Sequence, residues 1–280
     1  MNKTVLITGA SSGFGNLTAK KFQKESWNVV ATMRSPEKEQ ELNKLENVLV
    51  TKLDVTDKAS IEAAILDTVE KFGTIDVLVN NAGFGGNGYL EQFAEEQILR
   101  MFDTNVFGAI RVSQAVLPIM RERKNGTIIN VTSSAGYFGL PLNSTYCASK
   151  FAMEGLTESM ALEYKPFNIA VKAVAPGGYA TNFTASTDKN LENGDEELRT
   201  NAQKMAAHFA ETAAQMQKQS GAEANPQEVA DKIYECATTD APVHNICGAD
   251  AERLVGMMNS MPRQDFLNNM EEMLTPKEEK

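Results

Sequence analysis

Tyr146 and Lys150 stand four residues apart in the stretch Tyr146-Cys147-Ala148-Ser149-Lys150. On a helix this spacing places both side chains on one face. A phenol can exchange a proton with a reacting oxygen, but its ordinary pKa is about 10. A neighbouring ammonium favours the phenolate and lowers that pKa toward the working pH, where general acid–base catalysis is most efficient. The pair therefore predicts proton transfer, although a Tyr in isolation is more often a helix-face aromatic.

A second chemical feature is the glycine-rich turn Gly9-Ala10-Ser11-Ser12-Gly13-Phe14-Gly15, which follows the apolar run Val5–Thr8. Glycines there let backbone N–H groups approach a pyrophosphate, and the helix behind them offers free N–H donors and a partial positive charge. The turn has no Lys of the P-loop type. A glycine turn can also be purely structural, but its position between the first strand and the first helix favours dinucleotide binding.

The elements that must position these residues alternate along the chain. Short β-branched runs are typical of strands that are buried on both faces of a parallel sheet. They lie at 5–7, 27–31, 48–50, 77–79, 127–131 and 169–174, with helical patterns at 17–22, 61–72, 96–122 and 146–164 between them. Such alternation with right-handed crossovers predicts an α/β fold, a doubly wound parallel sheet of the Rossmann type with helices on both faces.

The chain is predicted to form a single domain over residues 1–280. Residues 183–225 are rich in Ala, Gln, Asn and Glu, and they contain no β-run. They predict a helical insertion, a lid over the active site, that is too short to own a core. Pro follows a capping residue at Ser35-Pro36 and Asn225-Pro226, which predicts two helix starts. Residues 243–247 predict an edge strand, 250–273 a helical segment and 275–280 a frayed tail.

The glycine spacing GxxxGxG resembles that of the short-chain dehydrogenase/reductase family. Three further segments carry the resemblance, which covers residues 3–181 and 226–255. Asn80-Asn81-Ala82-Gly83 is similar to the family's NNAG segment, Leu53-Asp54-Val55 to its adenine-side contact, and Pro176–Thr181 to its PGxxxT nicotinamide segment. The family membership implies an oxidoreductase that transfers a hydride between a nicotinamide cofactor and a carbonyl or alcohol carbon.

The resemblance also implies the roles of individual residues. Ser133, thirteen residues before Tyr146, would orient the substrate oxygen, Tyr146 would exchange the proton, and Asn105 would hold a water that links Lys150 to solvent. These four form the predicted catalytic set. The implied cofactor contacts are Gly9, Ser11, Ser12, Gly13, Phe14, Gly15, Asp54, Val55, Asn81, Ala82, Gly83, Tyr146, Lys150, Pro176, Gly177, Tyr179 and Thr181.

The end of the second predicted strand bears on the choice of cofactor. Enzymes of this fold that use NAD carry an acidic residue there for the ribose 2′-OH. This chain has Met33 followed by Arg34, and a guanidinium suits a 2′-phosphate. Arg34 could instead be a solvated surface residue. The sequence therefore predicts NADP in preference to NAD. Ala31-Thr32-Met33-Arg34 and His244–Ala251 also resemble the branch with 17β-hydroxysteroid and retinol dehydrogenases.

Composition excludes several classes of function. The formal net charge of −10 and the pI near 4.9 disfavour nucleic acid and anionic membranes as partners. Three cysteines without CxxC spacing and two histidines predict no metal site, and no apolar run reaches the length of a membrane span. We expect a cytoplasmic protein. The helical segments 96–122 and 146–164 carry more apolar surface than one sheet face needs, which predicts a homodimer or homotetramer.

The expected substrate is a small molecule that is a hydrophobic ketone, aldehyde or secondary alcohol. This expectation comes from the apolar character of the side chains predicted to line the pocket. Those side chains are Phe84, Tyr89, Phe138, Leu140, Leu142, Tyr179 and Phe183. An alternative is a non-enzymatic NADP-binding sensor or scaffold on the same fold. An epimerase or dehydratase of the family's longer branch fits less well, because its different glycine spacing and larger C-terminal domain are not seen.

Overall fold

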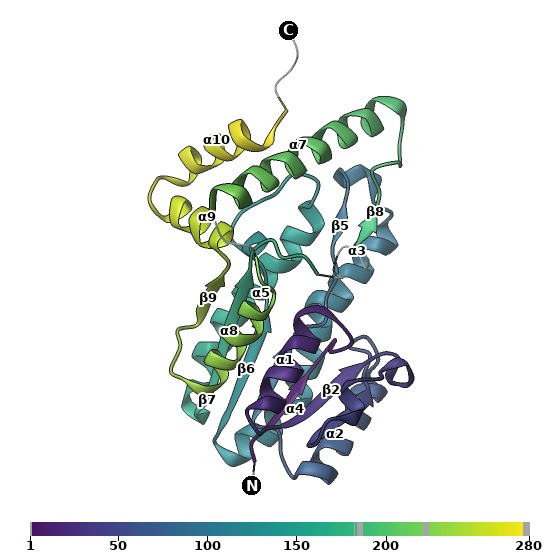
Figure 1. The fold of residues 1–280 in the computed structure, drawn as a ribbon, viewed down its shortest axis with the longest axis vertical. Coiled ribbons are helices and arrows are strands. Elements are labelled where there is room, and N and C mark those ends of the chain that lie inside the picture. The colour runs from purple at the N-terminus through teal and green to yellow at the C-terminus, as the bar shows by residue number, and fades with distance from the viewer. Residues whose placement is uncertain (1, 182, 184–186, 221–223, 277–280) are drawn as a thin grey trace.

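The computed structural model describes residues 2–181, 183, 187–220 and 224–276. Its centre is a parallel sheet of seven strands in the order β3-β2-β1-β4-β6-β7-β9 (Figure 1). The strands are β1 (Thr4–Ile7), β2 (Asn28–Met33), β3 (Val48–Lys52), β4 (Val77–Asn80), β6 (Gly126–Val131), β7 (Ile169–Pro176) and β9 (His244–Cys247). The strand order reverses between β1 and β4, so the ligand crevice of this fold lies at their carboxyl ends.

The predicted Rossmann-type sheet is confirmed, and each of the six predicted strands lies within two residues of an observed one. The short apolar runs identify the strands because helices cover both faces of the sheet. Successive strand residues are therefore buried on whichever face they point to. The four residues of β1, Thr4–Ile7, are all almost completely buried. The predicted edge strand corresponds to β9, which pairs with β7.

Helices cover both faces of the sheet in two layers (Figure 1). On one face lie α1 (Gly13–Lys24) and α8 (Gln227–Thr238), which share an apolar core containing Phe22 and Ile233. The other face carries α2 (Lys58–Phe72), α4 (Ala109–Arg123) and α5 (Ser144–Tyr164), whose core contains Ile61, Val112 and Met160. Before α4, helix α3 (Glu95–Phe102) continues through one π-helical turn, Asp103–Gly108.

Beyond the carboxyl edge of the sheet lies a group of helices, α7 (Glu196–Ser220), α9 (Ala249–Asn259) and α10 (Arg263–Leu274), at the top of Figure 1. The segment predicted as helical over 250–273 is divided between α9 and α10. Pro262 precedes α10 with extended backbone angles, and a proline within a helix would remove a hydrogen bond and clash with the preceding turn.

Two predictions about local structure are corrected. The segment 183–225 contains a strand, β8 (Asp188–Lys189), which pairs in parallel with β5 (Gly86–Asn87). Two residues carry no periodic signal, so this pairing depends on contacts distant in sequence. The helix predicted to start at Ser35-Pro36 is only a three-residue 3₁₀ turn, Pro36–Lys38. Residues 184–186 and 221–223 of the predicted insertion, and 277–280 of the predicted tail, lie outside the described residues.

Candidate active site

The glycine turn between β1 and α1 is closely packed against the loop after β4. Gly9 has a positive φ of 67°, and a Cβ added there would lie 3.0 Å from the Cα of Ala82. A Cβ at Gly15 would lie 2.6 Å from the amide nitrogen of Asn81. Both positions therefore require glycine, one for its backbone conformation and both for the close approach of the chain.

Side chains on either side of the turn hold it in place. The Thr8 hydroxyl accepts hydrogen bonds from the backbone N–H groups of Asn81 and Ala82, each at 3.0 Å. In return the Asn81 side-chain amide donates to the carbonyls of Thr8 and Gly9 at 2.9 and 3.1 Å. The Asn80 amide bonds to Asn130 on the neighbouring strand. The NNAG segment thus fixes the turn, and Thr8 is a member of this network that the sequence analysis missed.

The first turn of α1 offers donors to an anion. Ser12 is the N-cap residue of α1, and its side chain makes no capping hydrogen bond. The N–H groups at the start of a helix have no partner within it, and the helix dipole adds a partial positive charge. Ser11, Ser12 and Gly13 line the large cavity described below. Together with the glycines that admit close approach, these groups fit the pyrophosphate of a dinucleotide.

The predicted adenosine side of the crevice contains Arg34 and Asp54, which both line the cavity. The Asp54 carboxylate accepts hydrogen bonds from the backbone N–H and the hydroxyl of Thr56 at 2.9 and 2.7 Å. Burial raises the pKa of Asp54, but these bonds and the positive charge of Arg34 hold it below its ordinary value. Met33 is 3% exposed and also lines the cavity. Position 33 therefore supplies no carboxylate that could bind a ribose 2′-OH.

The loop after β7, which is predicted to contact the nicotinamide, is held by the segment that follows β9. The Gly177 N–H donates to the carbonyl of Cys247 at 2.8 Å, and the Gly178 N–H donates to the Asp250 carboxylate at 2.7 Å. Tyr179 packs edge-on against Phe14 with ring centroids 5.6 Å apart. Asp250 belongs to the stretch His244–Ala251, which sequence analysis used only as a resemblance, and 72 residues separate it from Gly178.

Tyr146 lies in the first turn of α5, and Ser133 lies just beyond the end of β6. The pKa of Tyr146 is raised to about 12 by burial, while a hydrogen bond with Ser133 acts to lower it. The four-residue spacing of Tyr146 and Lys150 predicted a lowered pKa for Tyr146, caused by the neighbouring ammonium. Protein side chains alone do not produce that effect, because removing the phenolate from water costs more than its neighbours return. Ser133 also accepts a hydrogen bond from the Ala135 N–H.

Lys150 is buried on the same face of α5 as Tyr146, with its Nζ 5.6 Å from the centre of the Tyr146 ring. The ammonium donates a hydrogen bond to the carbonyl of Val131 at 3.0 Å. Burial lowers the pKa of Lys150 to about 8, and the negative charge of Glu154 acts in the opposite direction. Glu154 lies one turn further along α5 and is another neighbour of the site that sequence reasoning missed.

Asn105 is buried in the π-helical turn that joins α3 to α4. Its side chain accepts a hydrogen bond from the Phe84 N–H at 3.0 Å and donates to the Phe84 carbonyl at 2.9 Å and to the Ser149 hydroxyl at 3.1 Å. A Cβ at Gly83 would lie 3.1 Å from the Asn105 oxygen. Asn105 therefore ties the loop after β4 to α5. Single π-helical turns are frequent at functional sites.

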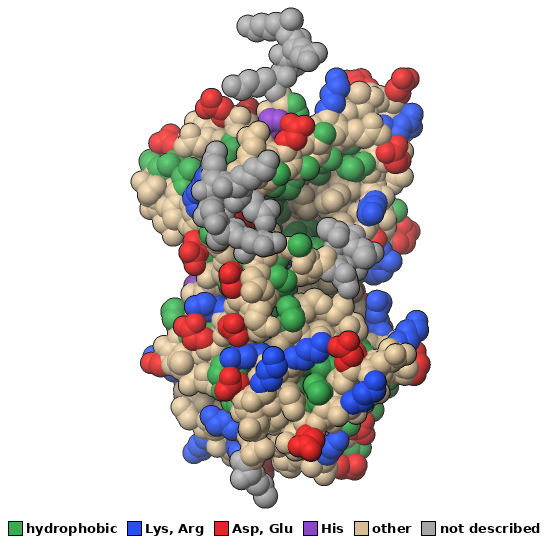
Figure 2. Space-filling view, viewed as in Figure 1, with side chains coloured by type: hydrophobic (Ala, Val, Ile, Leu, Met, Phe, Trp, Pro, Cys, Tyr) green, Lys and Arg blue, Asp and Glu red, His purple; other side chains and the backbone are tan. Residues whose placement is uncertain are grey.

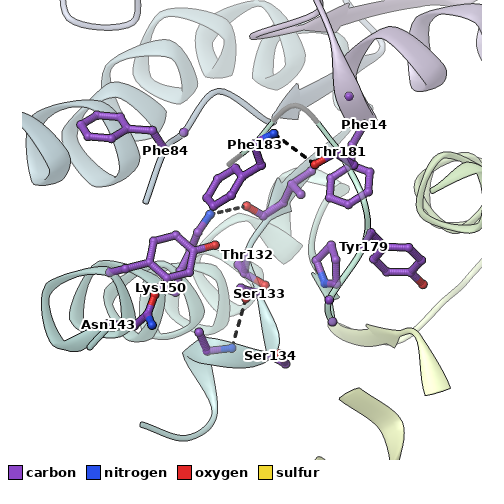
Figure 3. Close-up of a pocket in the computed structure, with 18 of the residues that line it drawn as sticks. Phe14, Phe84, Thr132, Ser133, Ser134, Asn143, Lys150, Tyr179, Thr181 and Phe183 are labelled. Carbon is purple, nitrogen blue, oxygen red and sulfur yellow. Dashed lines mark hydrogen bonds between the residues drawn. The ribbon is translucent and has the colours of Figure 1, made fainter. Parts of the chain in front are cut away.

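One cavity of about 1460 Å³ joins these parts. It exceeds the 300–1,000 Å³ of a typical ligand pocket, so it has room for a nucleotide and a second ligand. Figure 3 shows Phe14, Tyr179 and Thr181 together on one side of it, facing Ser133 and Lys150. Among the predicted site residues, Gly15 and Asn105 lie behind the lining and all others contribute to it. Of the predicted pocket side chains, Tyr89 is not part of the lining.

The two histidines make protein contacts outside the nucleotide crevice. His208 Nε2 lies 3.1 Å from the carbonyl of Met273, and His244 Nδ1 lies 2.8 Å from the Glu154 carboxylate. Cys147, next to Tyr146, is buried. In the part of the chain that the structure describes, no group of three His, Cys, Asp or Glu side chains could hold a metal ion. No helix among the described residues is long and apolar enough to cross a bilayer.

The family model for the short chain dehydrogenases matches residues 3–192. The chain belongs to the short-chain dehydrogenase family. The predicted family resemblance is thereby confirmed. This short-chain dehydrogenase is accordingly an oxidoreductase of CH–OH groups with a nicotinamide cofactor.

The sequence is also similar to those of individual relatives. It is 39% identical to the uncharacterized oxidoreductase YusZ of Bacillus subtilis, over 85% of this chain and 86% of that protein. Identity to human retinol dehydrogenase 8 is 41%, over 65% of this chain and 60% of that protein, which confirms the predicted likeness to retinol dehydrogenases.

Two solved structures have a similar fold. A short-chain dehydrogenase from Streptomyces avermitilis superposes with a TM-score of 0.80 and 31% identity, over 97% of this chain and 96% of that one. ElxO with NADP bound gives a TM-score of 0.73 and 31% identity, over 88% and 96% of the two chains.

Proposed function

We propose that the protein is an NADP(H)-dependent oxidoreductase that interconverts a hydrophobic ketone or aldehyde and the corresponding alcohol. The observation that carries this proposal is the juxtaposition of Tyr146 and Ser133 in the same cavity as the glycine turn. A hydride acceptor or donor and a proton donor or acceptor must meet at one carbon–oxygen bond, and a single cavity of this size allows it. The bound nicotinamide supplies or takes the hydride.

The residues of the chain have separate tasks in this proposal. In reduction, negative charge develops on the carbonyl oxygen, so hydrogen-bond donors must already point to that oxygen. Ser133 orients the oxygen, and Tyr146 delivers its phenolic proton to it; oxidation reverses both steps. The Lys150 ammonium stabilises the phenolate that remains after proton delivery. Asn105 holds the loop after β4 beside Lys150. It also holds the water that links Lys150 to solvent in this proposal.

We propose NADP as the preferred cofactor because Arg34 lines the adenosine end of the cavity and Met33 stands where a carboxylate would repel a 2′-phosphate. ElxO, which has been solved with NADP bound, supports the proposal as a relative of the same fold. The proposed nucleotide contacts are those named in the sequence analysis, with Gly15 acting through packing of the turn rather than by direct contact.

We also propose that residues 1–280 form one domain, whose segment 183–225 covers the site, and that the protein assembles into a homodimer or homotetramer. Support for assembly comes from apolar side chains exposed on and beside the predicted pairing helices, among them Phe107, Phe151 and Leu162. Light scattering at micromolar concentration should report a dimer or larger species, and a monomer would contradict the assembly. Cytoplasmic location remains a prediction of the sequence.

The test of the catalytic proposal is a screen of aldehydes, ketones and alcohols with NADPH or NADP, read by nicotinamide absorbance. Turnover of hydrophobic carbonyls or secondary alcohols is expected, with a preference for the phosphorylated cofactor. Tight binding of NADPH without turnover across the whole panel would instead favour the non-enzymatic sensor or scaffold.

A further inference from the structure

The cavity continues past Tyr146 into a compartment that the nucleotide contacts do not use, here named the tail chamber. Its walls are contributed by α7, by α10 and by the loop after β6. The residues used to define it are Ala206, Ala210, Ala213, Met270, Met273 and Phe138. Figure 2 shows hydrophobic side chains gathered over the helices in this upper part of the molecule. The tail chamber therefore extends the reaction site with a long apolar surface.

The wall formed by α7 combines a row of alanines with the larger apolar side chains of Phe209 and Met216. Ala206, Ala210 and Ala213 follow each other by four and three residues, so they lie on one face of the helix. They span about 10 Å along the helix axis. Because each of these three side chains ends at Cβ, the row forms a shallow track along α7.

The remaining residues that define the tail chamber are apolar and adaptable. Met270 and Met273 of α10 face the cavity, and Phe138 adds an aromatic ring. Methionine is unbranched and flexible, so it can follow the outline of an irregular apolar ligand. Among the described lining residues on α7 and α10, none carries a charged or hydrogen-bonding side chain. A polar group placed here would lose its water without gaining a partner, which disfavours polar ligands.

Direct contacts hold α7 against α10. His208 Nε2 lies 3.1 Å from the Met273 carbonyl, and the Thr212 hydroxyl donates to the same carbonyl at 3.5 Å. Phe209 packs against the apolar cluster that includes Phe138 and Met270. The contacting helices and the alanine track together give the tail chamber an apolar wall about 10 Å long. An extended hydrocarbon chain can lie along a wall of that length.

We propose that the substrate is an unbranched long-chain ketone or secondary alcohol, whose reacting carbon lies beside Tyr146 and whose tail lies along Ala206, Ala210 and Ala213. This inference rests on the proposed function, because it assigns the substrate class of the same site. Each methylene buried in the tail chamber should raise kcat/KM about fourfold until the track is filled.

The first experiment measures kcat/KM with NADPH for the series from 2-hexanone to 2-tetradecanone, and for a rigid tetracyclic ketone. The wild type should show a steep rise with chain length and prefer the longer linear ketones to the tetracyclic one. A flat profile, or a preference for the tetracyclic ketone, would overturn the substrate class. If no ketone in the screen is reduced, including 2-hexanone, the proposed function itself fails, so the two failures are distinguishable.

The second experiment narrows the tail chamber at one position. Ala210→Phe should lower the ratio of kcat/KM for 2-dodecanone to that for 2-hexanone by at least about tenfold, with 2-hexanone itself changed by less than about threefold. Ala207→Phe is the matched control, since Ala207 is exposed on the same helix and does not line the cavity. The Ala207→Phe variant should have the wild-type ratio of kcat/KM for 2-dodecanone to that for 2-hexanone.

Ala213→Phe provides an independent check, because it narrows the same track at the next turn of α7. It should also lower the ratio of kcat/KM for 2-dodecanone to that for 2-hexanone. The proposal is overturned if Ala210→Phe and Ala213→Phe leave the ratio unchanged, if they lower turnover of all ketones equally, or if Ala207→Phe alters the ratio to the same extent.

Discussion

The cofactor crevice and the tail chamber belong to one cavity but are built by different physical means. In the crevice, backbone segments are held by buried hydrogen bonds, such as those that join Thr8 to Asn81, and by glycines whose neighbours leave no room for a Cβ. The tail chamber has walls of alanine and methionine side chains on helices. The crevice therefore constrains which residues its backbone geometry allows, whereas the tail chamber constrains the volume and the apolar surface of a ligand.

The largest expected effect is the loss of chemistry on removal of one hydroxyl. Tyr146→Phe should lower kcat/KM at least about 100-fold for every substrate, because general acid–base catalysis contributes 10²–10⁴-fold. NADPH affinity, measured by fluorescence titration, should stay near the wild-type value. Tyr164→Phe removes a hydroxyl from the other end of α5 and is the control. Residual activity above about one tenth of wild type would exclude Tyr146 as proton donor.

A pair of glycine substitutions compares the two regions directly. Gly15→Ala should destabilise the protein by about 1–3 kcal/mol and weaken NADPH binding, since its Cβ would overlap the Asn81 side chain in the crevice. Gly256→Ala in α9 meets no described atom within 4 Å and should stabilise the protein by about 0.5–1 kcal/mol. Denaturant unfolding measures the change in unfolding free energy of each variant. Equal changes in the two variants would contradict the contrast between the crevice and α9.

The cofactor preference should change with the end of β2. Met33→Asp together with Arg34→Ile should shift relative kcat/KM from NADPH toward NADH by at least about tenfold. The new carboxylate accepts from the 2′-OH, and loss of Arg34 removes a charge-assisted hydrogen bond of roughly 1.5–3 kcal/mol. Ionic strength must be fixed, because salt screens such a pair.

Because Met33 is 3% exposed, the unfolding free energy of this double variant should be followed alongside the kinetics. An unchanged cofactor ratio, or equal use of NADH and NADPH by the wild type, would show that Arg34 is a surface residue that does not determine the cofactor preference. Ser12 in the glycine turn would then be the next candidate for reading the phosphate.

The smallest expected effect tests how the C-terminal segment supports the crevice. Asp250→Asn replaces the carboxylate that accepts from the Gly178 N–H with a neutral amide. The loss of charge assistance should raise KM for NADPH about fivefold while kcat at saturating cofactor stays near wild type. Glu252→Gln removes an exposed charge on the same helix and serves as control. An unchanged KM would show that the loop after β7 is held without Asp250.

The sheet, the glycine turn and the positions of Tyr146 and Lys150 on one helix could all be predicted from the sequence. These features are local: a buried parallel strand is a continuous apolar run, and a helix face recurs every three to four residues. The two-residue strand β8 was missed because so short a segment cannot be distinguished from a loop. The break before α10 does have a local signal, Pro262, which the prediction of one helical segment over 250–273 did not use.

Only the tertiary structure decided how distant side chains meet and what their charges cost. Asp250 reaches Gly178 across 72 residues, and Thr8 holds Asn81 across a similar separation. The raised pKa of Tyr146 follows from its burial, which depends on every element packed around it. The tail chamber likewise exists only because α7 and α10 pack beside the carboxyl edge of the sheet. Burial and long-range hydrogen bonds are collective properties of the packed chain, so no local pattern encodes them.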